Sequence, residues 1–252
     1  MSNLDQNTYR AQTGARAQEI DEGLRSYMLG IYNYMMMALA VTGIAALAIT
    51  NFGLKDIFFN TVPTQYGPRE TLNMVGWIAV IAPLGIVFYL SARMHKMSVG
   101  AAQMWFWAFA ALIGVSVANL LFNYTEESVA RVFFITAASF AGLSLWGYTT
   151  KKDLSGWGSF LIMGVIGLII AMVVNIFLGS STLHWVISIL GVGIFAGLTA
   201  YDTQNLKNIY LGGVDKEGHE VVQRVSIMGA LRLYLDFINM FFFLMALLGE
   251  RE

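Results

Sequence analysis

The sequence has no cysteine, little charge and three prolines in its 252 residues. Without cysteine, both a disulfide framework and any site built on a thiolate are excluded. Charged residues make up 12% of the chain, whereas soluble proteins have about 25%. The formal net charge of −1 provides no long-range field that would attract nucleic acid, so no nucleic-acid partner is expected.

Apolar side chains are in excess, at 57% of the chain against roughly 45 to 50% in soluble proteins. A helix crosses the hydrocarbon core of a bilayer, about 30 Å thick, with about 20 residues. Six apolar runs approach or reach that length, the sixth being the shortest. They are Tyr27 to Thr50, Leu72 to Leu90, Ala101 to Phe122, Val132 to Tyr148, Phe160 to Leu178 and Trp185 to Leu198.

A seventh run, Ser226 to Gly249, is as long as the first but contains Arg232 and Asp236. The sequence therefore predicts an all-α, polytopic membrane bundle of seven helices, and leaves open whether the seventh crosses completely. We expect a polar tail over residues 1–26, a transmembrane domain over 27–249 and a short tail over 250–252. The first tail lacks the basic-then-apolar pattern of a signal peptide, so the first run is expected to remain as an anchor.

Basic residues are preferentially retained on the cytoplasmic side of a membrane. Ten lie in the first tail and in the second, fourth and sixth connections, and four lie on the opposite side, which predicts a cytoplasmic amino terminus. The ten are Arg10, Arg16, Arg25, Arg93, Lys96, Lys151, Lys152, Lys207, Lys216 and Arg224, and the four are Lys55, Arg69, Arg131 and Arg251.

Two aspartates interrupt the apolar pattern. Asp202 stands at the end of the sixth run in GLTAYDTQ, and Asp236 lies inside the seventh in LRLYLDFINMFFF. A charged residue at the centre of a membrane helix costs about 2.5 to 3.5 kcal/mol, so such residues usually face the protein interior and mark a pathway or relay. One loop, expected over residues 202–224, joins the two runs. Both aspartates therefore belong near the same membrane face, where their carboxyl groups can meet.

Two carboxylates in a water-poor site cannot both ionise cheaply, so the pair of Asp202 and Asp236 is expected to share a proton. Once both are deprotonated, their oxygens suit a transient contact with a hard cation such as calcium. The alternative is that Asp202 is interfacial and wet while Asp236 pairs with Arg232 one turn away. The three histidines have no metal-ligand spacing, and no cofactor is expected.

AYDTQNLK, from Ala200 to Lys207, and LYLDFINMF, from Leu233 to Phe241, resemble the transmembrane Bax inhibitor motif family, also called the Bax inhibitor-1 family, in a bacterial form. The resemblance spans the seven-segment layout. It implies a central seventh helix and a pH-sensitive calcium leak. It also implies that Asp202 and Asp236 form the proton sensor.

In the family's closed state an arginine near the end of the second helix pairs with the sixth-helix aspartate. Arg93, in SARMHKM, is the nearest match and thus a candidate latch. Arg232 departs from the small or polar residue usual before LYLD, and is a rival latch. Some bacterial members resemble regulators of a membrane protease complex, which makes a non-conducting regulator the alternative function.

We expect no enzymatic activity. Intramembrane aspartyl proteases also place a YD on one helix and a second aspartate on the next, because acid and base roles need two carboxylates. Their second motif is GxGD, where this chain has LYLD, and their later proline-containing motif is missing, since the last proline is Pro83. The expected location is the bilayer of a bacterial inner (plasma) membrane.

Overall fold

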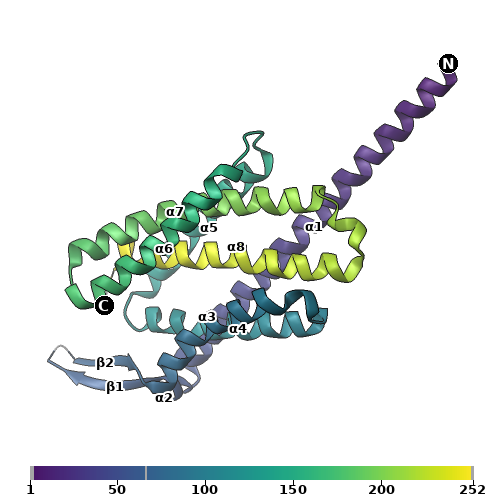
Figure 1. Cartoon of the computed structure of the whole chain (residues 1–252). Coiled ribbons are helices and arrows are strands. Elements are labelled where there is room, and N and C mark those ends of the chain that lie inside the picture. Colours follow the sequence, from purple (N-terminus) through teal and green to yellow (C-terminus); the bar gives the residue numbers. More distant parts are fainter. Residues whose placement is uncertain (1–2, 66, 251–252) are drawn as a thin grey trace.

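The computed structural model describes residues 3–65 and 67–250. Seven of its helices are long and apolar enough to cross a membrane, which confirms the all-α polytopic prediction (Figure 1). These helices are α1 (Asn3–Asn51), α3 (Met74–Arg93), α4 (Val99–Leu121), α5 (Glu126–Thr149), α6 (Ser155–Leu178), α7 (Ser181–Leu211) and α8 (His219–Leu248). Shorter elements are α2 (Lys55–Phe58), β1 (Phe59–Thr64), β2 (Gly67–Leu72), η1 (Met94–Lys96) and η2 (Val214–Glu217).

The breaks between spanning helices coincide with residues that cap helix ends. The side chains of Asn73, Ser98, Thr125 and Ser180 each accept a hydrogen bond from a backbone N–H in the first turn of α3, α4, α5 and α7. Such caps satisfy donors that have no partner inside the helix. At its other end α6 stops at Gly179, whose φ of +59° favours glycine.

The expected amino-terminal tail is not separated from the first span. α1 is continuous from Asn3, and Leu24 is already buried at 4% exposure, so residue 26 marks no break in the helix. The part of α1 that qualifies as a membrane span is Asp21–Asn51. The expected tails also include residues 1, 2, 251 and 252, which lie outside the described residues.

Asp202 was expected at the end of the sixth segment, and this is wrong, because the helix extends well beyond the sixth apolar run. α7 has 31 residues, so Asp202 lies nine residues before the end of the helix rather than at it. The expected loop over residues 202–224 shrinks to residues 212–218. A helix satisfies its own backbone, and can therefore continue past its apolar run wherever its polar side chains find partners. α8 is likewise one unbroken helix of 30 residues, long and apolar enough to cross a membrane.

α8 is the central helix, packed against α1, α4, α5 and α7 (yellow in Figure 1). Its Leu233 and Tyr234 have no exposed surface. The Tyr234 hydroxyl lies 2.6 Å from Oγ1 of Thr42, which in turn donates to the carbonyl oxygen of Ala110 at 2.8 Å. This chain of hydrogen bonds joins α8, α1 and α4 at the centre of the bundle.

Contacts among helix ends and connections divide these ends into two groups, one on each side of the bundle. At one end Tyr27 and Tyr210 pack their rings together, Arg224 donates to the Met97 carbonyl and Lys207 donates to the Tyr148 carbonyl. At the other end the Glu250 carbonyl accepts from the Thr125 N–H, and Arg131 forms an ion pair with Glu250. This alternation is the one expected of seven successive crossings.

The sequence analysis missed a β-hairpin in the first connection. Strands β1 and β2 pair antiparallel from Phe59 opposite Leu72 to Thr64 opposite Gly67. Phe59 anchors the hairpin, because it is only 2% exposed and its ring meets Phe122 edge-on at 5.0 Å. The hairpin lies at the end of the bundle away from the first residues of α1 (Figure 1).

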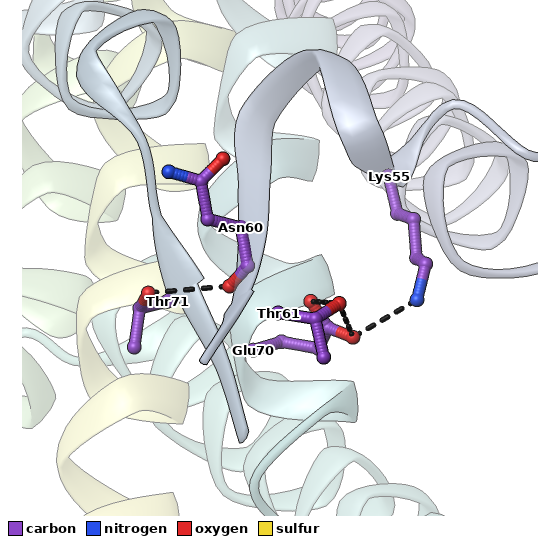
Figure 2. Close-up of polar contacts among 5 residues, drawn as sticks. All are labelled: Lys55, Asn60, Thr61, Glu70 and Thr71. Atoms are coloured by element: carbon purple, nitrogen blue, oxygen red, sulfur yellow. Dashed lines mark hydrogen bonds and ion pairs between the residues drawn. The ribbon is translucent and has the colours of Figure 1, made fainter. Parts of the chain in front are cut away.

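Polar contacts around one carboxylate join the hairpin to α2 (Figure 2). Glu70 accepts from Lys55 Nζ at 2.9 Å and from Thr61 Oγ1 at 2.8 Å. Burial by itself raises the pKa of Glu70, but the hydrogen bonds from Lys55 and Thr61 outweigh it and hold that pKa below its usual value. The hydrogen bond to Glu70 correspondingly raises the pKa of Lys55.

Candidate functional site

The two aspartates that the sequence singled out meet between α7 and α8. The carboxyl groups of Asp202 and Asp236 lie close enough to interact directly with each other. Asp236 is 4% exposed and Asp202 is partly buried. A carboxylate can only accept, so a hydrogen bond between two carboxyl groups requires at least one proton. The pair lies at the contact between two neighbouring helices.

Two glycines bring neighbouring helices into contact with α7 immediately before Asp202. A Cβ on Gly147 of α5 would collide with the carbonyl oxygen of Ala200, and one on Gly158 of α6 would collide with the ring of Tyr201. Close backbone approach through small residues is the usual way in which membrane helices associate. α7 is thus held on two sides at the residues that precede Asp202.

Side chains just after Asp202 fasten α7 to the connection between α5 and α6. Gln204 accepts from the Leu154 N–H at 2.8 Å and donates to the Lys152 carbonyl at 2.8 Å. Lys207 donates to the carbonyl of Tyr148 at 2.8 Å. These contacts explain why the helix persists beyond its apolar run.

A second set of polar contacts runs from α1 through α5 to α7. The Tyr32 hydroxyl lies 2.6 Å from Ser144 Oγ, which lies 2.9 Å from Thr203 Oγ1. Thr203, the residue after Asp202, donates onward to the Thr199 carbonyl at 2.7 Å. The helix carrying Asp202 is therefore tied to α1 as well as to α5.

Sequence reasoning missed Ser144, Thr203, Gln204 and Lys207 as supports of the site. Three of them follow Asp202 in YDTQNLK, a polar stretch that was assigned to a loop. The signal was present, because Thr199, Thr203 and Lys207 recur every four residues, as on one face of a helix.

The positive charge that reaches the pair belongs to Arg232. It acts electrostatically on Asp202, on Asp236 and on Tyr27 of α1. Within the described residues Arg232 forms no ion pair with Asp236, in contrast to the alternative interpretation of the sequence. Arg93 lies exposed at the end of α3, and neither carboxyl group has an interaction with it.

Two buried polar atoms lack a hydrogen-bond partner among the residues that the structure describes. They are Oδ2 of Asp236 and the hydroxyl of Tyr27. Leaving a buried polar group unpaired costs about 1 to 3 kcal/mol, so the few that native proteins keep need a reason. Both atoms belong to residues influenced by Arg232, which places the unsatisfied groups around the aspartate pair.

The aspartate pair offers few ligands to a metal ion. In the described part of the chain no group of three or more His, Cys, Asp or Glu side chains is placed to hold a metal ion. Calcium takes six to eight oxygen ligands in proteins, as a rule. Asp202 and Asp236 can supply only part of that shell, so they fit a brief contact with a cation that keeps most of its water.

The sequence matches known proteins over nearly its whole length. The family model described as inhibitor of apoptosis-promoting Bax1 matches residues 24–252. Protein RP147 of Rickettsia prowazekii is 45% identical over 95% of this chain and 96% of its own length. The inner membrane protein YbhL of Escherichia coli is 40% identical over 91% of this chain and 94% of its own length. The chain therefore belongs to the Bax inhibitor-1 family of membrane proteins.

Proposed function

We propose that this protein is a proton-gated cation leak, for calcium, in a bacterial inner membrane with its amino terminus in the cytoplasm. The observation that supports the proposal is the proximity of Asp202 and Asp236 on two spanning helices, because a shared proton would turn it into a hydrogen bond between them. The inner membrane location is supported by the name of the Escherichia coli relative. The orientation is supported by the distribution of Lys and Arg.

Gating follows from the charge of the pair. While one proton is shared, the hydrogen bond between Asp202 and Asp236 holds α7 against α8, and the leak is closed. When both carboxyl groups ionise, like charges in a site of low dielectric repel strongly, and the two helices separate near this point. The four carboxylate oxygens then become available to a passing hard cation.

The pH dependence of calcium flux tests the proposal. The protein is reconstituted in vesicles, and flux is followed between pH 5 and 9 for the wild type, Asp202→Asn and Asp236→Asn. Either variant keeps a hydrogen-bonding side chain but cannot reach the doubly ionised state, so its flux should no longer rise with pH. Asp215→Asn, at an exposed position, is the matched control and should behave as the wild type. An unchanged pH profile in both pair variants would falsify the proposal.

A second pair of variants identifies the charge that sets the operating range. Arg232 favours the ionised carboxylates, so Arg232→Gln should move the rise of flux to higher pH. Arg93→Gln should leave the profile in place, because Arg93 has no interaction with the pair in the structure. A shift in Arg93→Gln alone would instead favour Arg93 as the latch, in a state that differs from this one.

The alternative is a non-conducting regulator of a membrane protease complex. The observation that favours it is the length of α1. The first turns of α1 extend beyond the other helices and form a rod outside the bundle (Figure 1). Deleting residues 2–19 leaves the buried Leu24 in place and separates the two functions. A leak should still conduct, whereas a regulator should lose its effect on proteolysis in cells.

We also propose that the protein is not an enzyme. Two aspartates in contact are what an aspartyl protease requires, and the decisive observation is whether a membrane substrate is cut. Cleavage of a fluorogenic intramembrane substrate by the purified protein, lost in Asp202→Asn and Asp236→Asn, would replace the leak by a protease.

A further inference from the structure

An apolar groove runs between α1 and α5. Its volume is about 810 Å³, within the range of about 300 to 1,000 Å³ that ligand pockets have. On α1 it extends from Asp21 to Leu39 and on α5 from Phe133 to Tyr148, with Phe237 of α8 as its floor. Both walls are membrane-spanning helices, so the groove faces the hydrocarbon of the bilayer.

The ends of the groove differ in chemistry. Asp21 and Arg25 lie at one end, where α1 leaves its membrane span, and both side chains are exposed. Beyond them the lining is apolar, and its buried hydroxyls, on Tyr32 and Ser144, are hydrogen-bonded to each other. One positive and one negative side chain above an apolar channel match a zwitterionic amphiphile.

The walls offer an acyl chain an uneven apolar surface. Long side chains, including Leu29, Met36 and Leu145, stand beside a row of small ones on α5, at Ala137, Ala141 and Ser144. A second helix would pack on that row of small residues, so dimer formation at this face is the competing outcome. Methionine is flexible and adapts to irregular apolar surfaces, which suits a mobile hydrocarbon chain. The floor is firm, since the ring of Phe237 meets those of Phe133 and Phe140 edge-on at 5.6 and 5.7 Å.

The length of the groove also fits a lipid. From Asp21 to Leu39 a helix rises about 27 Å at 1.5 Å per residue. Half of a bilayer with its headgroup region is about 20 Å thick, and the groove follows a helix that crosses the bundle obliquely (Figure 1). We propose that this groove binds one phospholipid of the bilayer, with an acyl chain between α1 and α5 and a zwitterionic headgroup at Asp21 and Arg25.

Photolabelling in vesicles tests the proposal independently of any ion flux. The probe is a phosphatidylethanolamine with a photoactivatable group on one acyl chain, diluted into vesicles of phosphatidylethanolamine and phosphatidylglycerol, and labelled peptides are located by mass spectrometry. Label should concentrate on the α1 and α5 residues of the groove and exceed that on α6, a helix that is mostly lipid-exposed. Equal label on the groove and α6 would mean bulk bilayer lipid only, and would overturn the proposal.

Two alanines on α5 give a matched pair of variants. Ala141 lines the groove and Ala138 does not, and both are exposed. Ala141→Phe fills the channel and should abolish the excess label there, whereas Ala138→Phe should keep it. If the excess label survives in Ala141→Phe, the proposal is wrong. The proposal is also wrong if the excess is lost because a second copy of the protein covers this face.

The headgroup assignment can be tested with changes that leave the apolar channel intact. Arg25→Gln should lower the excess label about fivefold, the contribution of one basic residue beside an anionic group. Lys96→Gln, at an exposed lysine outside the groove, should leave it unchanged. Replacing the probe by its phosphatidylglycerol analogue removes the amine that Asp21 would meet, and should also reduce the label. Equal labelling by the two headgroups would overturn the assignment of a zwitterionic lipid, whether or not Ala141→Phe folds.

Discussion

α6 and α8 are both spanning helices, yet their composition and position are opposite to what a soluble protein would show. α6 has no charged residue from Ser155 to Leu178, and only 11% of its most apolar stretch is buried. α8 contains two arginines, a glutamate and an aspartate, and half of its most apolar stretch is buried. In a bilayer the apolar helix can face lipid at no cost, whereas the polar helix needs protein around it.

The comparison also explains where the candidate site lies. Interior positions of a membrane bundle gain little from apolar contact with neighbours, because lipid offers the same contact. Close packing and hydrogen bonds therefore fix α8, as between Tyr234 and Thr42. Asp236 belongs to this polar interior and meets Asp202 of α7 there.

The largest effect should come from truncating the interior of α8. Tyr234→Ala removes a fully buried ring together with its hydrogen bond, and large aromatic-to-alanine changes cost about 3 to 5 kcal/mol. Phe177→Ala, at 85% exposure on α6, removes a similar ring from a lipid-facing position and should change little. The free energy of unfolding in mixed micelles of detergent and dodecyl sulfate compares the two. Equal losses would break the contrast between the helices.

Glycine substitutions should give the next largest effect. Gly147→Ala forces α5 away from Ala200 of α7, and overpacking of this kind costs about 1 to 3 kcal/mol. Gly142→Ala, on the same helix, meets no atom within 4 Å and should be neutral. The thermal midpoint in detergent, measured by light scattering or intrinsic fluorescence, reports the difference. Destabilisation in Gly142→Ala alone would contradict the assigned contact.

A smaller effect is expected from one interior hydrogen bond. Thr42→Val preserves volume but leaves the Tyr234 hydroxyl and the Ala110 carbonyl without this partner, at a cost of about 1 kcal/mol. Thr149→Val, on an exposed turn of α5, loses only a bond to its own helix and serves as the control. The free energy of unfolding in the same mixed micelles reports this loss. The result sharpens the comparison between α8 and α6, because α6 forms no equivalent interhelical hydrogen bond within the described residues.

The smallest effect concerns the hairpin, which lies outside the bundle. The lowered pKa of Glu70 means that its contribution to stability is complete above the usual carboxyl pKa and is lost as pH falls through the lowered folded-state value. Amide hydrogen exchange of residues 59–72, corrected for intrinsic rates, should therefore increase in acid. Glu70→Gln should make the exchange insensitive to pH in that range, while α8 exchanges slowly throughout.

Much of this architecture was predictable from the sequence. Apolar runs located all seven spans, because a bilayer imposes a minimum helix length, and the interruptions at Asp202 and Asp236 located the pair. The end of α7 was not predictable from hydropathy, since Gln204 and Lys207 find their partners on a distant connection. The hairpin was missed because its strands carry Pro63 and Pro68 and lack a clear apolar alternation.

The choice between the two arginines could not be made from the sequence either. Arg93 and Arg232 both lie near helix positions that a latch requires, and spacing along the chain does not say which faces the pair. Both arginines are exposed in this structure, but only Arg232 acts electrostatically on the two carboxyl groups.

The glycine contacts beside Asp202 have a mechanical consequence. At Gly147, α5 meets the backbone of α7, and at Gly158, α6 meets the Tyr201 ring of α7, in both cases with no spare room. Gly229 of α8 meets only the flexible ends of Leu206 and Ile31. α5 and α6 are thus each packed closely against α7 beside Asp202. Repulsion between the aspartates would accordingly separate α8 from α7 at the pair and would not part α7 from α5 and α6.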